Sequence, residues 1–142
     1  MQLHLKQDHV GLSSIDIDAA VDWYTSVLDF TVERRFEAGG MTFAFLVNDN
    51  VKLELMHTAR ENVQPEVTDV HASLTHERLH HLCVAVDDVD AAVEELRSRG
   101  VNLVGGPFDV PPINQRIAFI TDNARNVIEI TSPGTGPNKN DA

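Results

Sequence analysis

Two histidines and two glutamates stand at matching places in the two halves of the chain. His81 follows His9 by 72 residues, and Glu129 follows Glu54 by 75 residues. Imidazole nitrogens and carboxylate oxygens are donors that first-row transition metals accept. Two of each suit one divalent ion (Zn, Ni, Mn, Co or Fe) and leave coordination positions for water or a substrate. The residue types therefore indicate a metal centre, although the ligand set does not identify the metal.

The sequence that carries these four residues is itself duplicated, which is the strongest signal in the chain. The stretches His9–Leu12, Ile17–Asp22 and Lys52–Leu55 correspond to His81–Val84, Val89–Glu94 and Val127–Ile130. The offset grows from 72 to 75 residues along the copy, as expected of a duplication with small insertions. Two copies of one module are therefore predicted.

Each copy changes its hydrophobic period in the same order. A short apolar run at 10–15 precedes helical spacing from Ile17 to Leu28, with Asp16 placed to cap the helix. Gly39 and Gly40 predict a turn, and two β-rich runs follow at 41–47 and 51–56. The second copy repeats the scheme, and short strands near 31–36 and 101–104 complete it. We predict an α+β fold of two βαβββ modules whose strands form an eight-stranded, cup-shaped sheet.

Alternation along the strands predicts which side chains share a face, because successive residues of a strand point to opposite sides. Leu53 and Leu55 belong on the helix-covered face, which leaves Glu54 on the open face; Ile128 and Ile130 leave Glu129 there in the same way. Val10 and Leu12 place His9 on the open face. Leu82, Val84 and Val86 do the same for His81 rather than His80. All four candidate ligands are thus expected to face one cleft.

Composition excludes several classes of function. The chain has 142 residues, of which 42% are hydrophobic, and a formal net charge of −11. Such a charge repels phosphate backbones and anionic membranes, so neither nucleic acid nor a membrane is expected as a partner. The single cysteine cannot form an internal disulfide, and no signal-length apolar stretch is present, so a cytoplasmic location is expected.

The predicted organisation is one domain over residues 1–132. Module one covers about 5–57, a polar connection without clear periodicity covers about 58–78, and module two covers about 79–132. The segment 133–142, rich in Gly, Pro and Asn, is predicted to be a flexible tail.

The pattern resembles the vicinal oxygen chelate superfamily, which includes glyoxalase I, methylmalonyl-CoA epimerase, extradiol dioxygenases and bleomycin or fosfomycin resistance proteins. The resemblance covers nearly the whole chain, from His9 to about Pro133. The residues that carry it are Asp8–Leu12, Trp23–Tyr24, Leu28–Phe30, Leu53–Leu55, Leu79–Leu82, Val86–Asp90 and Val127–Ile130. It implies paired modules around one metal, with ligands at His9, Glu54, His81 and Glu129, and a homodimeric assembly.

The resemblance also guides the choice of chemistry. A carboxylate at Glu54 is similar to glyoxalase I, whereas extradiol dioxygenases use a three-ligand set. Glutathione recognition is not supported, because Ser13 and Thr58 replace the arginine and asparagine of glyoxalase I. Segment 79–103 is similar to methylmalonyl-CoA epimerase, although that enzyme has an amide where this chain has Glu54. Metal-free bleomycin-binding members lack these ligands, which argues against that subclass.

The expected function is therefore a metal-dependent lyase or isomerase of the glyoxalase type that acts on a small molecule or thioester, without an organic cofactor. Glu129 or Glu54 would act as the base for proton transfer next to a metal-chelated carbonyl. Three alternatives remain: a methylmalonyl-CoA epimerase-like isomerase, an Fe(II) ring-cleaving dioxygenase using His9, His81 and Glu129, or a non-catalytic protein that sequesters a ligand.

Several other residues have less specific expectations. Trp23 and Tyr24 follow helical spacing and are expected in the core, and Cys83 is expected to be a packed strand residue, although it could instead line the cleft. Gln115 and Arg116 precede a strand and could meet an anionic substrate. His57 and His80 adjoin the predicted ligands and could support them.

Overall fold

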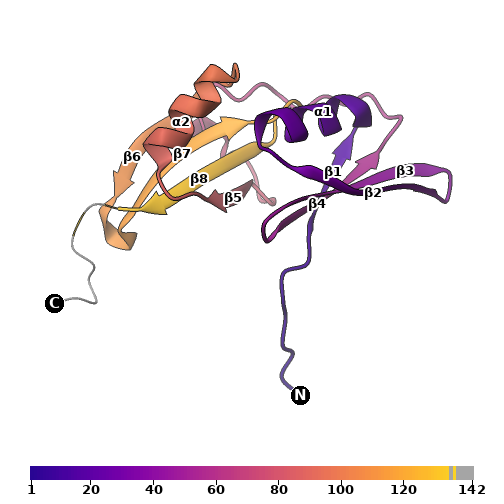
Figure 1. Cartoon of the computed structure of the whole chain (residues 1–142), viewed down its shortest axis with the longest axis horizontal. Helices are drawn as coiled ribbons and strands as arrows, with labels where there is room; N and C mark the ends of the chain where they lie inside the picture. Colours follow the sequence, from indigo (N-terminus) through magenta and orange to yellow (C-terminus); the bar gives the residue numbers. More distant parts are fainter. Residues whose placement is uncertain (135, 137–142) are drawn as a thin grey trace. The chain divides into compact units, whose positions relative to one another are not determined.

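The computed structural model describes residues 1–134 and 136 of the chain. The chain divides into two compact units, Met1–Asn62 and Val63–Ala142, which we call the first and second unit. Each unit contains a strand, a helix and three further strands in that order (Figure 1). The predicted pair of βαβββ modules is confirmed.

In the first unit, one helix lies on one face of a four-stranded mixed sheet. The strand order is β1-β4-β3-β2, with β1 parallel to β4 and the other neighbours antiparallel. Ala44 and Leu46 on β3 and Leu53 and Leu55 on β4 are buried on the helix side, together with Tyr24 of the helix. The elements are β1 (Val10–Ser14), α1 (Ile17–Val27), β2 (Thr31–Ala38), β3 (Met41–Asn48) and β4 (Val51–His57).

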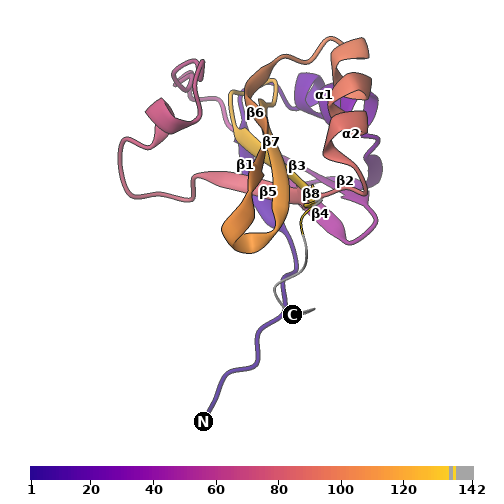
Figure 2. The same cartoon turned by 90° about the vertical axis from the view of Figure 1, so that its left-hand side faces the viewer.

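The second unit repeats this arrangement, with strand order β5-β8-β7-β6. Figure 1 and Figure 2 both show α2 lying along one face of its sheet. Ala118, Ile120, Ile128 and Ile130 are buried in this unit, with Val93 from the helix. Its elements are η1 (His71–Ser73), β5 (His81–Ala85), α2 (Val89–Ser98), β6 (Leu103–Val110), η2 (Pro111–Ile113), β7 (Gln115–Thr121) and β8 (Val127–Pro133).

Both helices begin at equivalent aspartates. The backbone N–H of Ala19 donates to Asp16 Oδ1 at 3.0 Å, and that of Ala91 donates to Asp88 Oδ1 at 3.1 Å. Each carboxylate satisfies an amide that the first helical turn leaves without a backbone acceptor. The prediction that Asp16 caps the first helix is confirmed, and the duplication extends to the cap.

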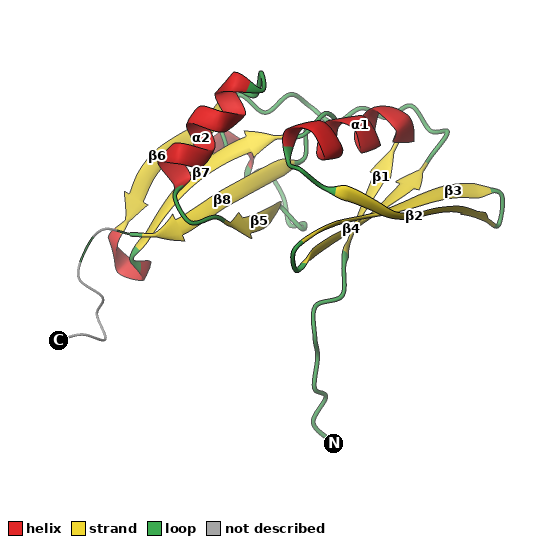
Figure 3. Cartoon of the chain, viewed as in Figure 1, coloured by secondary structure: helices red, strands yellow, loops and turns green. Residues whose placement is uncertain are grey.

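The connection between the modules is mainly loop (Figure 3). Two of its valines pack against the second sheet. Val67 and Val70 contact a cluster made by Ile117, Phe119 and Val127. The Val70 N–H also donates to the carbonyl of Val104 at 3.2 Å. The boundary between the two units therefore falls inside the predicted connection, and residues 63–78 belong with the second unit.

Strand β8 reaches the first residue of the segment 133–142. Pro133 is the last residue of β8, where it pairs with Gln115, and the Gly134 N–H donates to the Asn114 carbonyl at 2.8 Å. The ladder between β7 and β8 continues until its partner strand ends, which residue composition alone does not reveal. Positions 135 and 137–142 lie outside the described residues. No helix in the described part of the chain is long and apolar enough to cross a membrane.

Candidate metal centre

In the first unit, His9 and Glu54 point toward each other on the open face of the sheet. His9 directly precedes β1, and Glu54 lies in the middle of β4, beside Gly11 of β1. His9 Nε2 is 3.9 Å from Glu54 Oε2. This distance is too long for a hydrogen bond, but the two atoms are close neighbours. Their side chains keep 34% and 20% of their surface exposed, so solvent or a ligand can reach them.

The other nitrogen of His9 is held by a carboxylate. His9 Nδ1 lies 2.6 Å from Asp8 Oδ2. This hydrogen bond holds the pKa of Asp8 below its usual value. Desolvation opposes the shift, and the charges of His9 and Lys52 add to it. A carboxylate at Nδ1 favours the tautomer that carries its proton there and leaves the Nε2 lone pair free. His9 is thus prepared to bind an ion through Nε2.

The second unit holds the corresponding pair, His81 and Glu129. His81 is the first residue of β5, and Glu129 lies in the middle of β8. His81 Nε2 is 2.9 Å from Glu129 Oε2, with side-chain exposures of 35% and 17%. Without an ion, this distance fits a hydrogen bond from Nε2–H to the carboxylate.

A chain of side chains replaces the carboxylate behind His81. His81 Nδ1 lies 2.9 Å from His80 Nδ1, His80 Nε2 lies 2.7 Å from Ser73 Oγ, and the Ser73 hydroxyl donates to the Val70 carbonyl at 2.5 Å. When His81 uses Nε2 as a ligand, its Nδ1–H must donate to His80, so His80 carries its proton on Nε2 and donates to Ser73. Desolvation, together with the charges of His81 and Arg78, lowers the pKa of His80, which favours this neutral state.

An equivalent phenylalanine accompanies each pair. Phe45 lies opposite Glu54 in the β3–β4 ladder, and Phe119 lies opposite Glu129 in the β7–β8 ladder. The ring of His9 meets that of Phe45 edge to face at 5.5 Å, and His81 meets Phe119 in the same way at 6.1 Å. Each ring limits the positions that its histidine can adopt.

The donor chemistry of both pairs fits a divalent ion. Each pair offers one imidazole nitrogen whose partner nitrogen is already bonded, and one carboxylate oxygen beside it, which is how histidine–carboxylate metal sites are organised. The structure brings His9 together with Glu54 and His81 together with Glu129. Within residues 1–134 and 136, no group of three or more His, Cys, Asp or Glu side chains lies close enough to hold one ion. Binding of one ion by all four residues remains a prediction.

Cys83 lies beside the second pair and is not the packed residue that we expected. It faces Glu129 in the β5–β8 ladder and is exposed. Partial desolvation, and then the charge of Glu129, raises the pKa of its thiol to about 11. The local alternation placed Cys83 on the open face correctly, but the amount of cover over that face is a tertiary property.

Arg116 is paired with two aspartates. Its guanidinium donates to both carboxylate oxygens of Asp90 at 2.6 and 2.9 Å, and to Asp109 Oδ1 at 3.3 Å. These hydrogen bonds raise its pKa further above the usual arginine value. Gln115 is engaged as well, because the Thr131 hydroxyl donates to its Oε1 at 2.8 Å. Both residues are thus already engaged by partners in the second unit.

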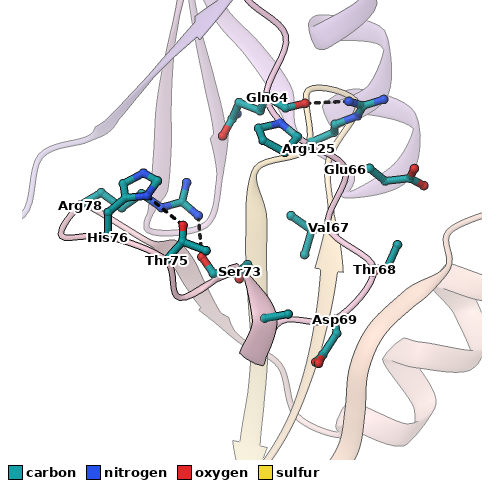
Figure 4. Close-up of a pocket in the computed structure, with 12 residues that line it drawn as sticks. Gln64, Glu66, Val67, Thr68, Asp69, Ser73, Thr75, His76, Arg78 and Arg125 are labelled. Carbon is teal, nitrogen blue, oxygen red and sulfur yellow. Dashed lines mark hydrogen bonds between the residues drawn. The ribbon is translucent and has the colours of Figure 1, made fainter.

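A separate pocket of about 320 Å³ lies along the connection in the second unit. Figure 4 shows Arg125 donating to the backbone carbonyl of Gln64, at 2.7 Å, and Arg78 donating to that of Ser73, at 3.2 Å. Glu66 and Asp69 also line the pocket, so its charge is mixed. Neither His81 nor Glu129 lines it, and it is therefore not the predicted centre.

Two supporting residues, Asp8 and Ser73, were not predicted from the sequence, whereas His80 was named there as possible support for a ligand. Asp8 was available as the residue next to a predicted ligand. Ser73 lies in the connection, where no periodic pattern linked it to His80. Of the expected core aromatics, Tyr24 is buried, whereas Trp23 is only partly covered.

Comparison with known proteins identifies the family. The model of the Glyoxalase/Bleomycin resistance protein/Dioxygenase superfamily matches residues 6–130, and the chain belongs to this superfamily. Solved structures have the same fold. A glyoxalase family protein from Enterococcus faecalis superposes with a TM-score of 0.75 at 16% identity, covering 89% of this chain and 97% of that one. A domain from Frankia sp. EAN1pec, described as glyoxylase/bleomycin resistance protein/dioxygenase, gives 0.74 at 20% identity, covering 99% and 100%.

Curated relatives with a distant match are epimerases. The mitochondrial methylmalonyl-CoA epimerase of Dictyostelium discoideum is 22% identical over 123 residues, which is 85% of this chain and 73% of that protein. The ethylmalonyl-CoA/methylmalonyl-CoA epimerase of Cereibacter sphaeroides is 27% identical over 100 residues, which is 69% of this chain and 73% of that protein. The predicted superfamily and fold class are confirmed.

Proposed function

We propose that the protein is a divalent-metal-dependent lyase or isomerase of the glyoxalase type, acting on a small carbonyl compound or thioester. The observation that carries this proposal is the duplicated pair: in each unit a histidine Nε2 faces a glutamate Oε2 while its Nδ1 is bonded from behind. A duplicated donor pair has no evident structural use on a partly exposed face. It has a clear use as half of a four-donor site.

The four residues would hold the ion through His9 Nε2, His81 Nε2 and the carboxylates of Glu54 and Glu129. A bound divalent ion would polarise two adjacent substrate oxygens and make the neighbouring C–H more acidic. Asp8 and His80 would fix the orientation of the two imidazoles. Glu129 or Glu54 would then accept the proton from carbon and return it, because in this arrangement each carboxylate would lie beside the bound substrate.

Isomerase chemistry on an acyl thioester is the second candidate. It is supported by the two epimerase relatives and by a pair of equivalent glutamates, which would let one carboxylate remove a proton and the other deliver it to the opposite face. The expected setting for either activity is a cytoplasmic homodimer with a small-molecule substrate.

The deciding experiment is an activity screen of metal-replete protein against hemithioacetals, 2-methylacyl-CoA esters and catechols, with elemental analysis of the same sample. Proton transfer should proceed without oxygen, so turnover in an anaerobic cell supports the proposal. Turnover of catechol that requires oxygen would replace it by a dioxygenase function. Retention of ligand affinity in EDTA, without turnover of any substrate, would replace it by a sequestering function.

A further inference from the structure

The open face of the first unit carries an array of aromatic rings and cations that the proposed chemistry does not use. Phe36 stacks on Phe43, with ring centroids 5.1 Å apart, and on Phe45, with centroids 6.0 Å apart. Arg34 lies 5.8 Å from the centroid of Phe36, and Lys52 lies 4.8 Å from that of Phe45. We call these five residues the aromatic face.

The strand register places this array beside the candidate base. Phe45 lies opposite Glu54 on one side and opposite Arg34 on the other, and Phe36 lies opposite Phe43. Directly opposed residues project to the same side of a sheet, so the array shares the face of Glu54. The neighbouring positions Ala44 and Leu46 are buried on the helix side. A molecule bound on the aromatic face would therefore reach Glu54 and His9.

The duplicated sheet of the second unit has different residues at the same places. Relative to Glu129 and Phe119, the ladders put Val127 at the place of Lys52 and Gly105 at the place of Arg34. By the same comparison Phe36 and Phe43 correspond to Phe108 and Ile117. The ligand pair and its phenylalanine are kept, but both cations are replaced by uncharged residues.

In the second unit, the connection lies over these uncharged positions. Val67 and Val70 of the connection pack on the cluster that contains Val127. A Cβ built on Gly105 would lie 3.1 Å from Val70 Cγ1, so a side chain there would push the connection away. The second sheet is apolar at these positions because its own chain lies over them.

The first unit has charged residues at the equivalent places. Arg34 is exposed and makes no ion pair within Met1–Asn62, and Lys52 pairs with Glu33 at 3.2 Å while keeping 30% of its side chain exposed. Three neighbouring phenylalanine rings that are partly exposed to water between two cations form an apolar patch, and such patches mark binding sites. Flat rings favour a flat apolar group, and cations above those rings favour an anion.

We propose that the aromatic face is the substrate-recognition surface and that the substrate is an aromatic acid, with its ring on Phe36, Phe43 and Phe45 and its carboxylate at Arg34 and Lys52. This assignment rests on the proposed function, because it orients the substrate's reactive carbon toward Glu54. The second unit, covered by its connection, contributes the other donor pair but little recognition.

Three probes separate the two parts of the claim. Phenylglyoxylate has both a ring and a carboxylate, pyruvate has the same adjacent oxygens without the ring, and methyl phenylglyoxylate has the ring without the charge. Titration calorimetry on the full chain should show phenylglyoxylate binding about tenfold more tightly than either of the others, as expected for one aromatic and one charge-assisted contact.

Variants then assign each preference to its residues. Arg34→Gln should remove the preference for the acid over the ester and leave the preference for the ring. Phe36→Leu should weaken phenylglyoxylate by about five- to tenfold and leave pyruvate unchanged. Phe108→Leu, at the equivalent place in the second unit, is the matched control and should change neither affinity. Circular dichroism of each variant checks that the fold is intact.

The outcomes keep this inference separate from the proposed function. Equal affinities for the three probes, or preferences that survive in Arg34→Gln and Phe36→Leu, would overturn it. The same titrations on Glu54→Gln measure recognition without the candidate base. If Glu54→Gln keeps the ring and charge preferences and the wild type turns over none of the screened substrates, the recognition surface is upheld and the catalytic proposal fails. Turnover by the wild type without either preference would uphold the catalytic proposal and overturn the recognition surface.

Discussion

His81 Nε2 lies 2.9 Å from Glu129 Oε2, whereas the equivalent atoms of His9 and Glu54 are 3.9 Å apart. The closer pair places Glu129 within direct reach of its histidine, and the wider pair leaves a gap between nitrogen and oxygen. The two halves of the proposed centre therefore have the same chemistry at different spacing.

The proposed base can be tested by a substitution that keeps its shape. Glu129→Gln keeps the size of the side chain but removes its ability to accept a proton at neutral pH, so the turnover rate should fall by about two decades or more. Stopped-flow or steady-state assays on the substrate found in the screen measure this. Glu94→Gln, on the exposed side of α2, is the control and should retain full rate. An unchanged rate in Glu129→Gln would exclude Glu129 as the base.

Metal should stabilise the folded chain. An ion that binds only the folded state raises the free energy of unfolding by about 2.7 kcal/mol at a hundred times its dissociation constant. Thermal unfolding with Zn, Ni, Mn, Co or Fe(II) added in turn to EDTA-treated protein should show this rise for at least one ion. His81→Asn should lose the shift and His71→Asn should keep it. If both variants respond equally, His81 is not a ligand.

The residues behind the histidines should tune metal affinity. Changes to the outer hydrogen-bond partners of a ligating histidine typically cost ten- to a hundredfold in affinity. Asp8→Asn, which removes the carboxylate charge at His9 Nδ1, and Ser73→Ala, which removes the partner of His80, should each weaken binding by about this factor. Competition with a chromophoric chelator measures the affinity, and ¹⁵N shifts of the imidazoles report the tautomers directly. Asp49→Asn, in the β3–β4 turn, is the control. A tautomer of His81 that does not respond to Ser73→Ala would disprove the proposed hydrogen-bond chain.

The two helix caps should contribute similar stability. Asp16→Ala and Asp88→Ala each leave a first-turn amide without its side-chain acceptor, which costs about 1 kcal/mol. Urea denaturation gives the free energy of unfolding. Asp22→Ala, within α1, should not destabilise the chain, because alanine has the better helix propensity there.

The Asp90–Arg116 pair should make stability depend on pH in the acid range. The hydrogen bonds that Arg116 donates to Asp90 lower the pKa of this carboxyl in the folded state. The pair therefore stabilises the protein above the pKa of the unfolded carboxyl, and this contribution is lost as the pH falls through the lower folded value. The difference in unfolding free energy between wild type and Asp90→Asn should be small and constant near pH 7 and should vanish in acid. A difference that grows toward low pH would contradict the assignment.

Local patterns were sufficient to predict much of this fold. Asp16, Gly39 and Gly40 marked the start of a helix and the turn of a hairpin. The repeat of His9 and Glu54 at His81 and Glu129 marked, in each unit, the sheet face that carries a histidine–glutamate pair. Alternation along a strand is fixed by backbone geometry, so these faces could be derived without coordinates.

Contacts between distant segments could not be derived in this way. Ser73 reaches His80 only because the connection turns back at η1, and Arg116 is engaged because Asp90 and Asp109 happen to lie on neighbouring elements. The exposure of Cys83 and the packing of Val67 and Val70 against the second sheet are likewise set by tertiary structure. Residue type and spacing carry no signal for such contacts.

The docking of Val67 and Val70 has a consequence for how this gene can change. A segment that joins two duplicated halves is normally free to vary in length, but here its valines are held to one half by packing and by a backbone bond at Val104. The stretch copied by duplication and the stretch that now acts as a structural unit therefore have different boundaries. Insertions in this family member should be tolerated before Val63 and selected against between Val67 and Ser73.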